Sequence, residues 1–204
     1  MRTVKVKCVG VSPLLMDRMS DETLDELRTG VRAQKPRDRP LDDVAAEKIY
    51  RENGAGSRIG LPAEMLFSCL ANAGRNVKNG KKQISTATTT TLPDILAIQN
   101  FFIPLTNVDP RKEKESWKAD RRRGRLDNGT AVCVVRPRFD QWEFEVEVEY
   151  DETKADESVV RSLFNNAGSA QGLGSFRPNC KGPFGRFKVT EWQQVEQKGK
   201  SAAA

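Results

Sequence analysis

The order of strand and helix patterns predicts a single α+β domain, and three observations support that prediction. Two segments alternate apolar and charged residues with the period of a half-buried strand, one near the N-terminus and one over residues 142–150. Two further segments carry apolar residues three and four positions apart, which is typical of a helix that buries one face. The length of 204 residues suits one domain, here taken as residues 1–204.

The first strand pattern, over residues 3–11, alternates apolar residues with lysines until Gly10 and the following Ser-Pro pair end it. A polar insertion lobe follows over about residues 17–58. Its thin apolar content predicts no more than a short helix, with Asp42 or Asp43 as the N-cap.

Apolar residues at helical spacing predict a buried helix over 62–75, with Pro62 in its first turn. The basic segment 76–92 has little to pack, and it is expected to be a loop or an extended hairpin. The apolar segment 95–105 lies between two prolines and is expected to be a strand, although periodicity alone does not distinguish it from a helix.

Residues 106–130 are predicted to form a second basic loop, followed by a short β-branched strand over 131–135. The segment 142–150 is the clearest strand, because aromatic and valine residues alternate with glutamates. A second helix is expected to begin after Asp156 and to end at Gly168.

A glycine-rich loop over 168–185, a final strand over 186–192 and a polar tail over 193–204 complete the chain. The order of elements is therefore strand, helix, strand, strand, helix, strand. That βαββαβ order is the ferredoxin-like order, here with long basic insertions.

The composition excludes several kinds of chemistry. The chain contains no histidine, which removes serine–histidine and cysteine–histidine nucleophile pairs, histidine-ligated zinc and histidine-based ribonuclease chemistry. Its four cysteines, Cys8, Cys69, Cys133 and Cys180, form no C-x-x-C pair, so they are expected to be reduced thiols and not zinc ligands. We expect no cofactor and no metal.

Charge is distributed unevenly along a chain whose formal net charge is +6. Basic residues recur in three insertions, around 75–82, 111–125 and 177–188, whereas acidic residues gather on the strand 142–150. A segregated basic face is the electrostatic footprint of a phosphate polymer. The aromatic residues within these insertions, Trp117, Phe176 and Phe184, are candidates for stacking on unpaired bases, with burial in the core as the alternative.

The glycine-rich loop is a candidate phosphate site because glycines let the backbone approach a ligand and expose N–H groups. It is not a dinucleotide fingerprint, since it lies between a helix and a strand in the wrong order, and it contains no Gly-Lys-Ser/Thr. The alternative is a crossover that only needs positive φ angles.

These features resemble a known family. The opening strand ends in Val11-Ser-Pro-Leu-Leu-Met16, the segment Ile59-Gly-Leu-Pro-Ala-Glu-Met-Leu66 leads into a helix followed by Arg75, and a glycine-rich loop precedes the last strand. This combination resembles the RAMP superfamily of CRISPR-associated proteins, most of all its backbone subunits, or a phage or mobile-element homologue of them.

The resemblance implies a modified RRM-like core that binds single-stranded guide RNA through backbone contacts, without sequence preference. It also implies side-by-side assembly with copies of itself into a filament and contact with other subunits of an effector complex. The finger-like hairpin that such subunits lay across the strand would be either 76–91 or 111–125.

The residues expected to bind nucleic acid come partly from the resemblance and partly from charge and aromatic character. They are Ser12, Arg75, Lys78, Lys81, Lys82, Trp117, Arg121, Arg122, Arg123, Arg125, Gly172, Gly174, Phe176, Arg177, Lys181 and Arg186, with Gly182 added by the resemblance.

Two alternatives remain open at this point. Some members of the superfamily cut RNA with an aspartate in the insertion after the first strand, and Asp17, Asp21 and Asp38 occupy suitable sequence. The other alternative is a module that binds duplex DNA or an acidic protein, such as a phage-encoded inhibitor that mimics a subunit. We expect no catalytic residue, no membrane partner and a cytoplasmic location, because the N-terminus lacks a secretory signal and no apolar stretch approaches the roughly 18 residues of a spanning helix.

Overall fold

The computed structural model describes residues 1–31, 38–54, 56–125 and 128–195. In chain order its elements are β1 (Arg2–Gly10), β2 (Leu14–Leu15), α1 (Asp21–Thr29), α2 (Leu41–Ala46), β3 (Gly60–Pro62), α3 (Ala63–Ala73), β4 (Lys78–Asn79), β5 (Lys82–Gln83), α4 (Leu92–Ile95), β6 (Leu96–Ile98), β7 (Phe102–Pro104), η1 (Pro110–Lys112), α5 (Glu113–Ser116), β8 (Lys118–Arg125), β9 (Ala131–Phe139), β10 (Glu143–Tyr150), α6 (Glu157–Asn166), η2 (Ala167–Gln171), η3 (Pro178–Cys180) and β11 (Phe187–Val195). Within these ranges no helix has the length and apolar character needed to span a bilayer.

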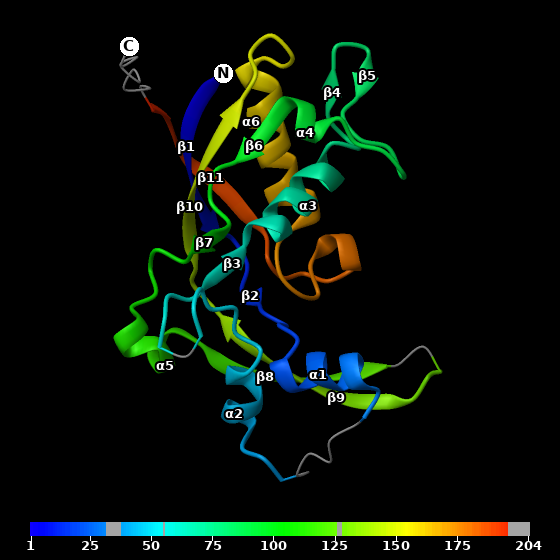
Figure 1. Cartoon of the computed structure of the whole chain (residues 1–204), viewed down its shortest axis with the longest axis vertical. Helices are drawn as coiled ribbons and strands as arrows, with labels where there is room; N and C mark the ends of the chain where they lie inside the picture. Colours follow the sequence, from blue (N-terminus) through cyan, green and yellow to red (C-terminus); the bar gives the residue numbers. More distant parts are fainter. Residues whose placement is uncertain (32–37, 55, 126–127, 196–204) are drawn as a thin grey trace.

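An antiparallel four-stranded sheet in the order β11-β1-β10-β6 forms the core of the fold. Numbered along the βαββαβ core, that order is 4-1-3-2, so the α+β, ferredoxin-like prediction is confirmed. Helices α3 and α6 pack together on one face of the sheet (Figure 1). Val4 lies opposite Val148 and Val6 opposite Val146 in the register, and all four side chains are buried beneath those helices.

The other face of the sheet is acidic. Strand β10 contributes Glu143, Glu145, Glu147 and Glu149 to it, and β1 contributes Lys5 and Lys7. Lys5 pairs with Glu145 at 2.5 Å, so the few cations on these two strands are already neutralised. RRM domains stack RNA bases on this face of the sheet, whereas excess carboxylates repel a phosphate backbone. This face of the sheet is therefore unsuited to binding a nucleic acid.

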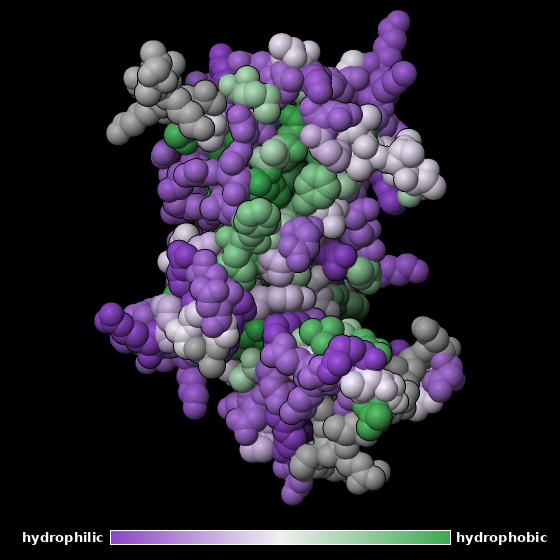
Figure 2. Space-filling model, viewed as in Figure 1, coloured by the Kyte–Doolittle hydropathy of each residue, from purple (hydrophilic) through white to green (hydrophobic). Residues whose placement is uncertain are grey.

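A second lobe extends from the end of β1, at the lower end of the long axis in Figure 1. It consists of the sheet β2-β9-β8 with α1 and α2 beside it. Helix α1 has no buried residue, and its Leu24 and Leu27 are exposed. Figure 2 shows apolar side chains at the surface of this lobe.

The structure differs from the sequence-based expectations in several elements, among them β9, which continues to Phe139 where the strand was expected to end at residue 135. Residues 118–125 form strand β8 where a basic loop was expected, because pairing with β9 organises a segment that lacks apolar alternation. The segment 95–105 divides into β6 and β7, which pair in different sheets. Helix α1 was not predicted, and α2 has Pro40 at its N-cap instead of an aspartate.

The boundaries of the other core elements agree closely with the sequence patterns. Helix α3 lies within the range expected for the first buried helix, and α6 begins directly after Asp156. The last strand, β11, continues to Val195, three residues beyond its expected end. Residues 196–204 of the expected polar tail lie outside the described residues.

Candidate nucleic-acid interface

The glycine-rich loop packs against the segment that leaves β1. The amide of Ser175 donates to the Leu15 carbonyl at 2.7 Å, and the amide of Arg186 donates to Oγ of Ser12 at 3.0 Å. The carbonyl of Ser12 in turn accepts a hydrogen bond from Trp142 Nε1 at 2.8 Å. The structure therefore brings together Ser12 and Arg186, which the sequence separates by most of its length.

Two glycines of this loop are required by close packing. Gly174 and Gly185 have φ angles of +74° and +71°. A Cβ atom at Gly185 would lie 1.8 Å from the Leu173 carbonyl oxygen, and one at Gly174 would lie 2.4 Å from that of Leu15. Any side chain at either position forces the loop away from the body of the protein.

The loop's amides are largely occupied within the protein. The N–H groups of Gly172, Gly182 and Gly185 donate to the carbonyls of Ala167, Arg177 and Pro13 at 2.8–2.9 Å. The expectation that glycine exposes N–H groups for phosphate is therefore wrong for these three residues, because the tight fold of the loop uses them internally. Anion contacts from this loop depend on its side chains.

Three cationic side chains lie along the loop: Arg177, Lys181 and Arg186. Arg177 is partly buried and donates through Nη1 to the Gly174 carbonyl at 2.7 Å, which leaves most of its five N–H donors for other partners. Lys181 and Arg186 are exposed, and neither side chain has a hydrogen-bond or ion-pair partner among the residues that the structure describes.

Backbone strain is concentrated in the same loop. Phe176 and Lys181, with φ angles of +51° and +60°, are the non-glycine residues in the left-handed region within the described ranges. Such strain persists where the surroundings enforce it, and it clusters at ligand sites. Phe176 is 41% exposed, and the centre of its ring lies 6.0 Å from the centre of the buried Phe184 ring. Packing against Phe184 therefore holds the Phe176 ring at the surface.

The β8–β9 hairpin contacts this loop through Arg122. Its guanidinium carbon lies 4.7 Å from the centre of the Phe184 ring, while its Nε donates to Asp120 at 2.6 Å. Hydrogen bonding from Arg122, with a smaller effect from Arg138, lowers the pKa of Asp120. Arg122 is therefore already committed to contacts within the protein.

The remaining arginines of β8 lie on the opposite face of the strand. Side chains alternate along a strand, and the register places Arg121, Arg123 and Arg125 opposite Val135, Cys133 and Ala131. All three arginines are exposed, and none has a hydrogen-bond or ion-pair partner among the described residues. We name these three residues the arginine row.

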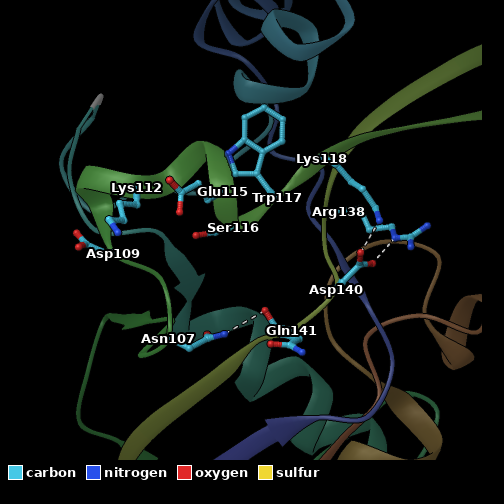
Figure 3. A pocket seen from close by; sticks show the side chains of 10 residues that line it. All are labelled: Asn107, Asp109, Lys112, Glu115, Ser116, Trp117, Lys118, Arg138, Asp140 and Gln141. Carbon is cyan, nitrogen blue, oxygen red and sulfur yellow. Dashed lines mark hydrogen bonds and ion pairs between the residues drawn. The ribbon is translucent and has the colours of Figure 1, made fainter.

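Trp117 precedes β8 and lines a pocket of about 580 Å³ (Figure 3). Its ring is partly buried against the core, and its indole Nε1 has no hydrogen-bond partner. Two of the three basic side chains of this pocket are paired, since Lys118 Nζ and Arg138 Nε lie 2.5 and 2.6 Å from the Asp140 carboxylate, whereas Lys112 has no ion-pair partner among the described residues. These ion pairs lower the pKa of Asp140, Arg138 having the larger effect.

The other predicted binding residues lie elsewhere. Arg75 donates to the carbonyl of Thr86 at 3.1 Å and so holds the turn that follows β5. Lys78, Lys81 and Lys82 belong to the β4–β5 hairpin, which lies at the opposite end of the long axis from β8 and β9 (Figure 1). The expected site residues are therefore divided between two ends of the molecule.

The aspartates considered for RNA cleavage have structural partners or lie at the surface. Asp17 accepts hydrogen bonds from Lys48 at 3.0 Å and from Arg136 at 2.6 Å. Asp21 pairs with a neighbouring arginine, and Asp38 is an exposed turn residue. Among the residues described by the structure, no group of three or more acidic or cysteine side chains is arranged to hold a metal ion.

Sequence reasoning missed two kinds of residue at this interface. Arg136 and Arg138 on β9 face the same side as Arg122, and the alternation of apolar residues with arginine over 135–139 could have indicated it. Gln171, which lines a pocket beside the loop, has no sequence pattern that distinguishes it from a solvent-exposed glutamine.

Comparison with known proteins identifies no family. No protein-family model matches the chain, and no curated protein matches its sequence. Among solved structures, the chain is similar to one from the cryo-EM structure of a type III-B Cmr-beta complex bound to cognate target RNA, with a TM-score of 0.47 and 11% identity. The match covers 95% of this chain and 60% of that chain, so this protein spans less than two thirds of its neighbour's length.

Proposed function

We propose that this protein binds single-stranded RNA, without chemistry, through the β8–β9 hairpin and the glycine-rich loop. The observation that carries the proposal is the arginine row, in which Arg121, Arg123 and Arg125 extend from one face of an outer strand without partners among the described residues. Side chains two positions apart on a strand are about 6.7 Å apart, which lets successive guanidinium groups follow an extended phosphate backbone.

Two further features favour a single strand over a duplex. Exposed Phe176 offers a ring on which an unpaired base can stack, and the cations Arg177, Lys181 and Arg186 follow it in the same loop and at its end. The open face of the main sheet is acidic and would repel a phosphate backbone, so the charge distribution supports a site on the second lobe and the loop.

The proposal extends to a place in a ribonucleoprotein, as one of several subunits along a guide RNA of CRISPR type, which the family resemblance implies. It predicts that the purified protein retains RNA of host origin. We would purify the chain without nuclease, separate it by size exclusion, and digest the nucleic acid with ribonuclease and deoxyribonuclease in parallel. An oversized, ribonuclease-sensitive peak supports the proposal, and its fragment length reports the subunit spacing.

Binding to defined strands then tests the choice of nucleic acid. Single-stranded RNA, single-stranded DNA and duplex DNA of equal length would be compared by fluorescence anisotropy at low salt. We expect single strands to bind more tightly than the duplex. Absence of binding to any single strand would refute the proposal.

One observation favours a second candidate, a protein-binding module. Leu24 and Leu27 leave an apolar side of α1 exposed, and such surfaces commonly mark protein contacts. A monomer that is free of nucleic acid and fails to bind added single strands would favour this candidate.

A further inference from the structure

A pocket lies between helix α3, the insertion lobe and the glycine-rich loop, on the side of α3 that carries Ser68 and Asn72. Its volume is about 310 Å³, at the lower end of the range for small-molecule sites, so it suits one nucleotide better than a longer ligand. Tyr50, Pro62 and Met65 supply its apolar wall. Its polar lining includes three side-chain amides, from Asn72, Gln171 and Asn179, together with Glu64, Ser68 and Arg177.

Gln171 is the central polar group of this pocket. The residue is only 9% exposed, it lines the pocket, and its side-chain amide has no hydrogen-bond partner among the described residues. The fully buried side-chain polar atoms without a partner among the described residues belong to Trp117 and Trp192, so the Gln171 amide keeps contact with solvent through the pocket. Its N–H donors and its carbonyl oxygen are therefore available to a ligand that enters the pocket.

The backbone around Gln171 fixes its direction. Residues 167–171 form a π-helical turn, in which the Gly172 amide donates to the Ala167 carbonyl at 2.8 Å, and such turns are frequent at functional sites. The Cys69 thiol donates to the Gly172 carbonyl at 3.3 Å. Burial raises the pKa of Cys69 to about 12, so this sulfur remains a protonated donor and ties the turn to α3.

The groups that surround Gln171 match the parts of a nucleotide. Asn72 and Asn179 add amides, which pair with the donor and acceptor edges of bases. Arg177 enters from the glycine-rich loop and can hold a phosphate. Tyr50 offers a partly exposed ring against which a base can lie, and the Glu64 carboxylate at the rim accepts hydrogen bonds only.

We propose that this pocket holds one base of the bound RNA, with Gln171 reading its edge, Glu64 accepting from its amino group and Arg177 on its phosphate. This inference rests on the proposed function and deepens it, because it adds base recognition to a surface otherwise expected to contact the backbone alone. The pocket prefers adenine, cytosine and guanine over uracil, because uracil carries no amino group for the carboxylate.

The experiment uses mononucleotides, which reach the pocket without depending on the arginine row. The ¹⁵N-labelled full chain would be titrated with AMP, CMP, GMP and UMP at low salt, and the side-chain amide resonances would be followed. We expect the Gln171 resonance, assigned by its loss in Gln171→Met, to shift with the three amino-bearing nucleotides and less with UMP. Glu64→Gln should abolish that preference.

The glutamine variant has a matched control in the exposed Gln193 on β11. We expect Gln171→Met to weaken mononucleotide binding by about tenfold, the effect of one or two lost hydrogen bonds in a buried site, and Gln193→Met to leave it unchanged. Equal affinities for wild type and Gln171→Met, shifts confined to the arginine row, or no binding of any mononucleotide would overturn the inference.

Failure of this inference is distinguishable from failure of the proposed function. If single-stranded RNA binds with the same affinity in wild type and Gln171→Met and all base compositions are equivalent, the surface binds RNA and the base pocket is refuted. If mononucleotides bind as described but RNA strands do not, the pocket stands and the wider RNA-binding proposal fails.

Discussion

Replacing the arginine row by alanine, in the variant Arg121→Ala/Arg123→Ala/Arg125→Ala, tests the central step of the proposed function. These side chains are exposed and have no protein partners among the described residues, so their removal should leave the fold intact. The expected loss is confined to RNA binding, and it should be independent of RNA sequence.

The size of the effect follows from counterion release. Each phosphate contact to a single strand contributes about −0.7 to the slope of log K against log salt concentration. Three lost contacts make the slope less steep by about 2, which corresponds to about a 100-fold loss of affinity at 0.1 M salt, or ~2.8 kcal/mol. The difference should shrink as salt concentration rises towards 1 M.

The assay is fluorescence anisotropy of a labelled RNA of mixed sequence, measured across a series of salt concentrations for each protein. The matched comparison is the variant Lys78→Ala/Lys81→Ala/Lys82→Ala, which removes the same charge from the hairpin at the other end of the molecule. We expect its slope to equal that of the wild type. An unchanged slope in the arginine variant, or a larger loss in the lysine variant, would refute the assignment of the binding surface.

Three further predictions concern the fold that supports this surface. Gly185→Ala should lower the free energy of unfolding by about 3 kcal/mol or more in urea titrations, because the new Cβ would be placed at a positive φ and would clash with backbone atoms. The control is Gly129→Ala, where φ is also positive but the space around the residue is open, and it should lower the free energy of unfolding by about 1 kcal/mol. Equal losses would contradict the packing argument. Asp120 has a lowered pKa, so its stabilising effect is present above about pH 4 and is lost as the pH falls through that lowered pKa. Asp120→Asn should therefore destabilise the protein at pH 7 by about 1–2 kcal/mol, and its unfolding curve should converge with that of the wild type near pH 2; a pH-independent difference would exclude this role. In the native protein a thiol reagent should modify the exposed Cys133 and Cys180 rapidly, and it should modify the buried Cys8 and Cys69 only on unfolding. Counting the reactive thiols in the double variant Cys133→Ser/Cys180→Ser checks this.

The parts of this fold that were predictable are those whose pattern is local. Strands β1 and β10 and helices α3 and α6 each bury one face against the same core, so burial imposes a period that can be read along the chain. The order of these elements, together with short-range chain connectivity, was enough to indicate the βαββαβ topology.

The binding surface was predictable only in composition. The basic stretch around 111–125 was recognised from its charge, but strand β8 within it carries exposed arginines on both of its faces and so shows no alternation. Only pairing with β9 determines that Arg122 points to the glycine-rich loop while Arg121 and Arg123 point away from it.

Tertiary structure alone decided which polar groups are left without partners. Composition indicated a basic protein without histidine chemistry, because those properties are sums over residues. Whether a particular arginine is paired, whether a glycine's amide is occupied, or whether Gln171 faces a pocket depends on atoms contributed by segments distant in sequence. Hydrogen bonding and burial are properties of that arrangement, and they have no counterpart in the local order of residues.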